Sequence, residues 1–179
     1  MDKFLTLIMK SIAFKFSEIL KKHGKEDKLD KVLKIHKTDG YEYILNNLMP
    51  VAGVIELIKQ AHENKMKIGL ASGSPLIFIK SVLGKLGILK FFDSIISVDD
   101  LTHGKPHPEI FLKSAEALGV KPSECVVMED APQGIEAAKR AGMKCFAVTT
   151  TFQREKLAGA DWIAESFENL TIERLGQLI

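Results

Sequence analysis

Cysteine is scarce in this sequence, because Cys125 and Cys145 are the only two among 179 residues. So few cysteines exclude a secreted disulfide framework, and their spacing is not that of a metal-binding cysteine motif. Each stands at the head of a short apolar run typical of a buried strand, so we expect two free, buried thiols. The predicted compartment is the cytoplasm, which keeps thiols reduced.

The sequence also lacks a long apolar run and an excess of charge of either sign. No run reaches the roughly 20 residues that cross a membrane, and Lys10 interrupts the apolar segment near the N-terminus. Neither a membrane span nor a signal peptide is therefore expected. The formal net charge is only +2, and hydrophobic residues make up 46% of the chain. We expect an ordinary globular protein that binds neither membranes nor nucleic acid.

The pattern of apolar residues changes at Pro50. Before it, apolar residues recur at helical spacing with little glycine, which predicts a small helical subdomain over residues 1–49. After it, short apolar runs alternate with helical patterns over residues 50–179, which predicts a doubly wound parallel sheet in an α/β fold. The segment from Asn46 to Val51 is the candidate hinge between the two parts, because proline cannot continue a helix.

The expected elements of the second part follow from these runs and their turn residues. Strands are predicted at residues 67–72, 94–98, 125–128, 145–150 and 162–164. Helices are predicted at 51–61, 75–86 and 108–118, with a helix ended by Gly142, a short helix at 154–158 and a terminal helix from Thr171.

An acidic pair, Glu129-Asp130, ends the apolar run that begins at Cys125. In open parallel sheets, ligands bind beyond the carboxyl ends of the strands, and Mg²⁺ prefers carboxylate oxygens. The pair is therefore a candidate Mg²⁺ site. The simpler interpretation is that Asp130 caps the helix that follows.

Two further loops carry groups suited to phosphate. Ser72-Gly73-Ser74 offers hydroxyls and backbone N–H groups at the start of a helix. Lys105 lies on a loop stiffened by prolines and offers a positive charge. Taken singly, these are also compatible with a helix cap at Ser72 and a solvent-exposed lysine.

The order and spacing of the three loops resemble the haloacid dehalogenase superfamily of phosphohydrolases, over residues 50–165. Ala71-Ser72 resembles the second motif of the superfamily, which binds the transferring phosphoryl group. Gly104-Lys105-Pro106 resembles the third, whose lysine stabilises phosphoryl charge, and Glu129-Asp130 resembles the fourth, which holds Mg²⁺. The resemblance implies three sets of site residues: catalytic Lys105 and Ser72; phosphate-binding Ser72, Gly73, Ser74 and Lys105; metal-binding Glu129 and Asp130.

Within the superfamily, the chain looks most like the β-phosphoglucomutase-like group with a helical cap. Residues 70–76, Leu-Ala-Ser-Gly-Ser-Pro-Leu, and Lys105-Pro-His-Pro108 are similar to the hexitol and 2-deoxyglucose-6-phosphate phosphatases. Mutases of this group usually carry polar phosphate ligands where Pro75 and Leu76 stand, which favours a phosphatase over a mutase. The resemblance implies a Rossmann-like fold, a Mg²⁺ cofactor and a hexose or hexitol phosphate as substrate.

The first motif of the superfamily, a strand followed by Asp-x-Asp-Gly, is absent from the sequence. None of the nine aspartates stands in this pattern after an apolar strand. We therefore expect the central nucleophile strand to be missing and residues 1–49 to form only a partial cap. Its loss would leave a slot of roughly 10 Å between the strands that end at Ser72 and Glu129. An N-terminally truncated chain, whose complete form begins upstream of Met1, explains this best.

Two classes of function remain open. The chain is either part of a Mg²⁺-dependent sugar phosphatase that is inactive by itself, or a non-catalytic remnant that keeps a phosphate pocket. We expect a monomer, or an oligomer where a partner supplies the missing strand. The five histidines show no ligand spacing, and only His107, near Lys105, merits inspection.

Overall fold

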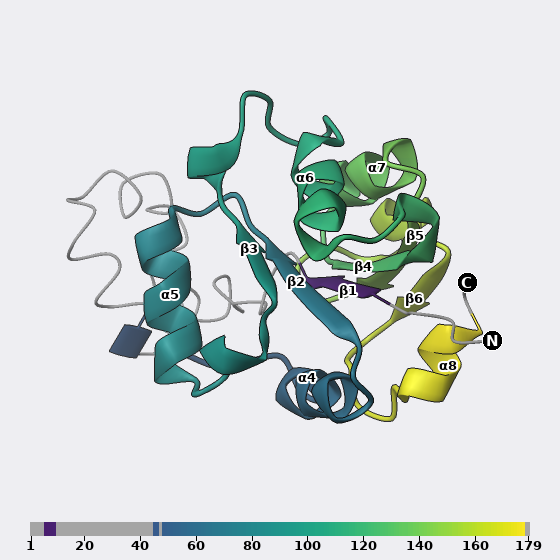
Figure 1. The fold of residues 1–179 in the computed structure, drawn as a ribbon. Helices are drawn as coiled ribbons and strands as arrows, with labels where there is room; N and C mark the ends of the chain where they lie inside the picture. Colours follow the sequence, from purple (N-terminus) through teal and green to yellow (C-terminus); the bar gives the residue numbers. More distant parts are fainter. Residues whose placement is uncertain (1–5, 10–44, 47, 178–179) are drawn as a thin grey trace, which may run out of the picture.

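The computed structural model describes residues 6–9, 45–46 and 48–177, and these form a parallel sheet flanked by helices (Figure 1). The sheet has six strands in the order β3-β2-β1-β4-β5-β6, and every neighbouring pair is parallel. Parallel neighbours need crossover connections, which the helices supply. The predicted doubly wound α/β fold is confirmed.

The bounds of the elements agree closely with the apolar runs of the sequence. The strands are β1 Thr6–Met9, β2 Lys67–Ala71, β3 Ser94–Ile96, β4 Cys125–Glu129, β5 Lys144–Val148 and β6 Trp162–Ala164. The helices are α4 Val54–Glu63, α5 Leu76–Lys85, α6 Glu109–Leu118, α7 Pro132–Arg140 and α8 Ile172–Gly176.

Each face of the sheet is covered by its own set of helices. Along β4, Val126 and Met128 pack into a core with α4, α5 and α8, whereas Cys125 and Val127 pack into a second core with α6 and α7. Side chains alternate between the two faces of a strand, so a strand buried on both faces is apolar throughout. The helices thereby fix β4, and with it the acidic pair at its end.

The centre of the sheet corrects one expectation. β1 lies between β2 and β4, pairing Thr6 with both Lys67 and Cys125 and Met9 with both Leu70 and Met128 (Figure 1). The position that we expected to be vacant is therefore filled by this chain, and no strand from a partner is needed there. The assignment of residues 1–49 to the cap is wrong for Thr6–Met9.

The remaining predictions for the first part of the chain are not tested. Residues 10–44 lie outside the described residues, so the helical cap stays a prediction. At the expected hinge, Lys85 Nζ donates a hydrogen bond to Asn46 Oδ1 at 3.2 Å, and Val51 is 4% exposed in the core. The described end of this segment is thus attached to the α/β part.

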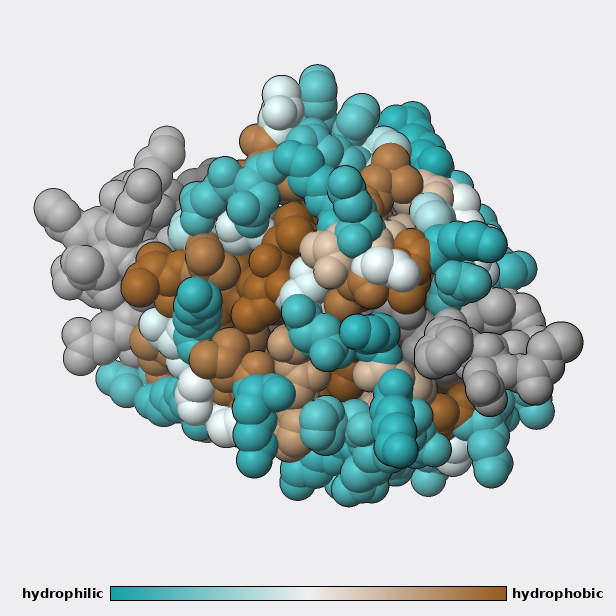
Figure 2. Space-filling model, viewed as in Figure 1, coloured by the Kyte–Doolittle hydropathy of each residue, from teal (hydrophilic) through white to brown (hydrophobic). Residues whose placement is uncertain are grey.

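The face shown in Figure 2 has apolar side chains gathered across its middle and hydrophilic ones around them. Large apolar side chains that are exposed include Ile77, at 73%, and Val98, at 42%. The Val98 N–H donates to the Ser74 carbonyl at 3.3 Å, so apolar side chains border the loop that carries Ser72. Within the described ranges, no helix is long and apolar enough to span a membrane.

Candidate functional site

Lys105 and Glu129 meet beyond the end of β4. The Lys105 Nζ donates to Glu129 Oε1 at 2.7 Å, and the side chains are 13% and 0% exposed. The same ammonium group lies 4.4 Å from the ring centroid of Phe111 in α6, a cation–π contact. Lys105 is therefore held in place in a partly buried site, and its interpretation as a solvent-exposed lysine is wrong.

Glu129 is fixed by the backbone as well as by Lys105. Its Oε2 accepts the N–H groups of Asp130, at 2.9 Å, and Ala131, at 3.1 Å. The carboxylate also lies against Gly134 in the first turn of α7, where a Cβ atom would overlap its oxygens. The glycine is needed because only a residue without a side chain leaves space for the buried carboxylate.

Asp130 is buried, at 7% exposure, and points toward the loop after β5. The Thr151 hydroxyl donates to its Oδ2 at 2.6 Å. The N-cap of α7 is Ala131, and within the described structure no side chain hydrogen-bonds to that helix as a cap. The interpretation of Asp130 as a simple helix cap is therefore wrong.

The Ser72 loop differs from the expected phosphate cradle in one respect. The Ser72 Oγ accepts the Ser74 N–H at 3.2 Å, which shapes the turn after β2. The start of α5 is already engaged, because Asp99 Oδ2 accepts the Leu76 N–H at 2.9 Å. Asp99, rather than Ser72, therefore caps α5, and a phosphate at this loop would depend on Ser72, on Ser74 and on the exposed Gly73 backbone.

The register of the sheet relates the two sides of the site. Leu70 and Met128 both pair with Met9, so Ser72 and Asp130 lie at the same level beyond their strands. One strand separates them, which corresponds to about 10 Å between their Cα atoms. The structure thus joins Lys105 to Glu129 directly, and places Ser72 across the end of β1 from Asp130.

The donors at the end of β4 are of the kind that Mg²⁺ prefers. Both side chains are carboxylates, and hard divalent cations favour oxygen ligands. Glu129 is also bound to Lys105 and to two backbone N–H groups, whereas Asp130 accepts the Thr151 hydroxyl. Glu129 and Asp130 both stay candidate metal ligands, and Glu129 also holds Lys105 in position.

A polar recess of about 590 Å³ opens beside Thr151. Its lining consists of hydroxyl, amide and charged side chains with one aromatic ring: Thr149, Thr150, Thr151, Phe152, Gln153, Arg154, Glu155 and Glu165. Sequence analysis did not identify this recess, because its residues come from the ends of two strands and an intervening short helix.

Sequence analysis also missed a cluster beside Lys105. His103, His107 and Glu109 have metal-ligating atoms within 4.8 Å of one another, so the statement that the histidines lack ligand spacing is wrong. The hydrogen bond from the Thr102 N–H, followed by that from Lys113, lowers the pKa of Glu109 to about 2. The missed signal was the interval His-x-x-x-His, which occurs in zinc sites.

The family model for haloacid dehalogenase-like hydrolases matches residues 6–142. Validoxylamine A 7'-phosphate phosphatase of Streptomyces hygroscopicus subsp. limoneus is 39% identical over 126 residues, which are 70% of this chain and 59% of that protein. β-Phosphoglucomutase of Bacillus subtilis is 37% identical over 142 residues, or 78% of this chain and 61% of that protein. The chain thus spans about three fifths of the length of these relatives.

Solved structures support the same fold. CbbY from Rhodobacter sphaeroides, in complex with phosphate, superposes with a TM-score of 0.75 at 20% identity, covering 97% of this chain and 99% of that one. β-Phosphoglucomutase from Clostridium difficile gives a TM-score of 0.74 at 24% identity, covering 99% of this chain and 96% of that one.

Proposed function

Because the chain belongs to the haloacid dehalogenase-like hydrolases, we propose that it provides the phosphate-binding and Mg²⁺-binding side of a phosphatase for small sugar phosphates. The observation that carries this proposal is the partly buried contact of Lys105 with Glu129 at 2.7 Å, beside Asp130 at the end of β4. A cation and a carboxylate pair at one edge of a parallel sheet match a phosphoryl group with its metal.

Each residue has a separate task in this proposal. Lys105 neutralises a phosphoryl oxygen, Ser72 donates a hydrogen bond to another, and Asp130 coordinates the metal. Glu129 keeps the ammonium of Lys105 in position. Mg²⁺, when bound, supplies charge stabilisation for the phosphoryl oxygens. A separation of about 10 Å between Ser72 and Asp130 leaves space for a phosphate and an ion between the side chains.

The start of α5 favours a phosphatase over a mutase. A mutase must bind the phosphate of a bisphosphorylated intermediate at a second place, and polar ligands are expected after Ser74. Here Pro75 has no N–H group, and the Leu76 N–H already donates to Asp99. Neither Pro75 nor Leu76 therefore offers a backbone N–H group to a second phosphate.

The recess beside Thr151 suits the sugar part of the substrate. Its lining is rich in hydroxyl groups, and Gln153 and Arg154 add donors. We assign to it a hexose or hexitol chain, which would place the phosphate toward Asp130. A hexitol phosphate should then bind more tightly than inorganic phosphate, and Gln153→Ala should reduce that difference.

Binding of each component tests the site without requiring turnover. Calorimetry with tag-free protein should detect Mg²⁺ and inorganic phosphate. Asp130→Asn should weaken Mg²⁺ binding, and Lys105→Met should weaken phosphate binding, each by about tenfold or more, because each removes one charge-assisted contact. The exposed Glu116→Gln and Lys80→Met variants are matched controls. Equal losses in the controls would contradict the assignment.

Turnover is expected to be negligible for this chain. In the sequence, β1 is followed by Lys10-Ser11-Ile12-Ala13, which contains no carboxylate, and loss of a nucleophile costs on the order of 10⁶ in rate. A sugar-phosphate panel should therefore show no Mg²⁺-dependent hydrolysis. Substantial hydrolysis that Asp130→Ala abolishes would mean that another residue attacks phosphorus.

The position of β1 suggests a test by gain of function. The triple variant Lys10→Asp, Ile12→Asp and Ala13→Gly creates Asp-Ser-Asp-Gly directly after the central strand. We expect it to gain Mg²⁺-dependent hydrolysis of hexose or hexitol phosphates. If the variant is folded and binds Mg²⁺ but stays inactive, β1 does not take the place of the family's first strand.

A further inference from the structure

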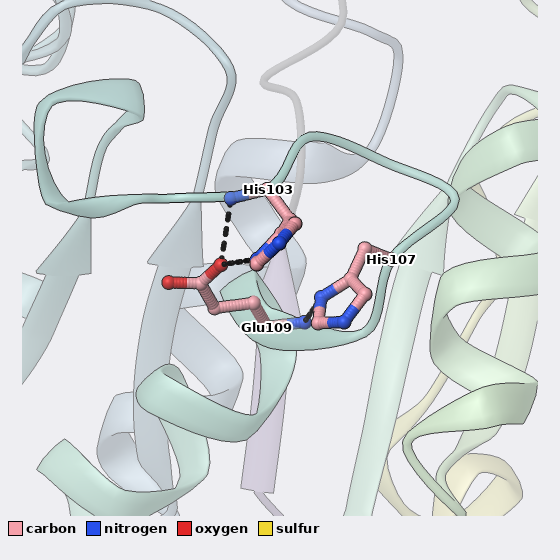
Figure 3. Close-up of side chains that lie close together, drawn as sticks. All are labelled: His103, His107 and Glu109. Atoms are coloured by element: carbon pink, nitrogen blue, oxygen red, sulfur yellow. Dashed lines mark hydrogen bonds and ion pairs between the residues drawn. The ribbon is translucent and has the colours of Figure 1, made fainter.

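A separate group of metal-ligating side chains surrounds the segment that carries Lys105. His103 and His107 lie on the loop before α6, and Glu109 is the first residue of that helix. Figure 3 shows the two imidazole rings next to each other, with the Glu109 carboxylate against His103. The ring centroids are 4.5 Å apart, and the ligand atoms all lie within 4.8 Å of one another.

The spacing is close to that of a coordination shell. His103 Nδ1 and Glu109 Oε2 are 3.2 Å apart. Two donors bound to one ion at about 2.0–2.2 Å in a tetrahedral arrangement are roughly 3.3 Å apart, so this pair already has ligand spacing. His107 has to approach by roughly 1–2 Å. Both histidines are exposed, so their rings can rotate without disturbing the core.

The backbone of the loop holds the donors near one another. Glu109 accepts the His103 N–H at 2.8 Å and the Thr102 N–H at 3.1 Å, and Lys113 Nζ lies 3.0 Å from its Oε1. His107 Nδ1 accepts the Glu109 N–H at 3.3 Å, so this nitrogen carries a lone pair. A metal ion bound to His107 Nδ1 would replace this long hydrogen bond. The Glu109 carboxylate would then bind both the ion and the N–H groups of the loop.

The donor set selects the kind of metal. Two imidazole nitrogens and one carboxylate oxygen suit Zn²⁺ and neighbouring transition metals, whereas Mg²⁺ prefers oxygen donors alone. We propose that His103, His107 and Glu109 form a binding site for a divalent transition metal, with Zn²⁺ as the representative ion. This site is distinct from the carboxylate pair at the end of β4.

An ion at this site would connect both ends of the segment 103–107, which carries Lys105. The present contacts have another structural role, because Glu109 also closes the loop through the N–H groups of Thr102 and His103. A loop-closing role needs Glu109 alone. Metal binding needs both imidazoles, and this difference is the basis of the test.

The test uses the tag-free 179-residue chain in millimolar MgCl₂, which competes with Zn²⁺ for the carboxylate pair. Zn²⁺ is titrated calorimetrically, and Co²⁺ is followed by its visible absorption. We expect saturable binding of one Zn²⁺ ion per chain. His103→Ala and His107→Ala should each bind at least about tenfold more weakly. His62→Ala, which removes an exposed histidine outside the cluster, should bind like the wild type.

Three results would overturn the proposal. They are no saturable Zn²⁺ binding by the wild type, unchanged affinity in either histidine variant, or an equal loss in His62→Ala. Circular dichroism and urea unfolding show whether each variant is folded, and exposed histidines are not expected to affect stability strongly. Glu109→Gln should also weaken binding, but the decision rests on the histidine variants because Glu109 closes the loop as well.

Discussion

Replacing Gly134 with alanine should test how strongly the buried carboxylate of Glu129 is constrained. A Cβ atom at position 134 overlaps both carboxylate oxygens of Glu129, so the side chain must leave its place. The displaced carboxylate then loses Lys105 and two backbone N–H groups. The variant therefore measures the stability that depends on the Lys105–Glu129 contact.

The expected magnitude follows from opposing contributions. Breaking a buried ion pair costs about 3–5 kcal/mol, whereas Gly→Ala within a helix gains about 1 kcal/mol. Gly134→Ala should therefore lower the free energy of unfolding by about 2–4 kcal/mol, measured by urea unfolding with circular dichroism. Gly84→Ala is the matched control, because within the described structure no atom lies within 4 Å of a Cβ at this site in α5. It should be neutral or slightly stabilising.

A double-mutant cycle separates the overlap from other effects. In a Glu129→Ala background the methyl group has space, so Gly134→Ala should cost less than about 1 kcal/mol there. Two results would refute the reasoning. One is a stability of Gly134→Ala equal to that of Gly84→Ala, and the other is the same loss in both backgrounds.

Three further outcomes follow from the structure. Burial raises the pKa of Cys125 to about 12 and that of Cys145 still further, so Ellman's reagent at pH 8 should label neither thiol until the chain is unfolded. Asp99→Ala removes the carboxylate that caps α5 and should cost about 1 kcal/mol of stability by urea unfolding. The hydrogen bond from the Ser97 N–H lowers the pKa of Asp100 below 3.8. The Asp100 carboxylate therefore contributes fully to the free energy of unfolding above pH 3.8, and this contribution is lost as the pH falls through the lowered pKa. The stability difference between wild type and Asp100→Asn should therefore shrink below pH 3.8, and a difference that stays constant would contradict this cause.

The α/β part was predictable because its pattern is repeated and unambiguous. Buried strand segments such as residues 125–128 are apolar throughout, and glycine or proline separates them from helices with one apolar face. Lys105 and Glu129 were found through motifs that occur on loops after strands. Their direct contact was not predictable, since it depends on how two separate loops meet.

The central strand was missed for a physical reason. Residues 4–12 contain apolar side chains at both helical and strand spacing, and a short apolar run does not distinguish the two. The missing Asp-x-Asp pattern was taken as the loss of a strand, but Thr6–Met9 occupies the sheet without it. Backbone pairing with a neighbour on each side determines whether a segment becomes the central strand. Such pairing requires only a suitable backbone and apolar side chains. The carboxylates that follow such a strand in the family are a separate property.

The place of β1 in the sheet has a consequence for the order of folding. β2 and β3 form one side of the sheet and β4 to β6 the other, and among the described strands β1 alone pairs with both sides. A ribosome makes β1 first but releases β4 only on the order of ten seconds later, at about 5–20 residues per second. Throughout that interval the apolar Leu7-Ile8-Met9 segment has no complete partner surface, and exposed apolar segments of this kind favour aggregation.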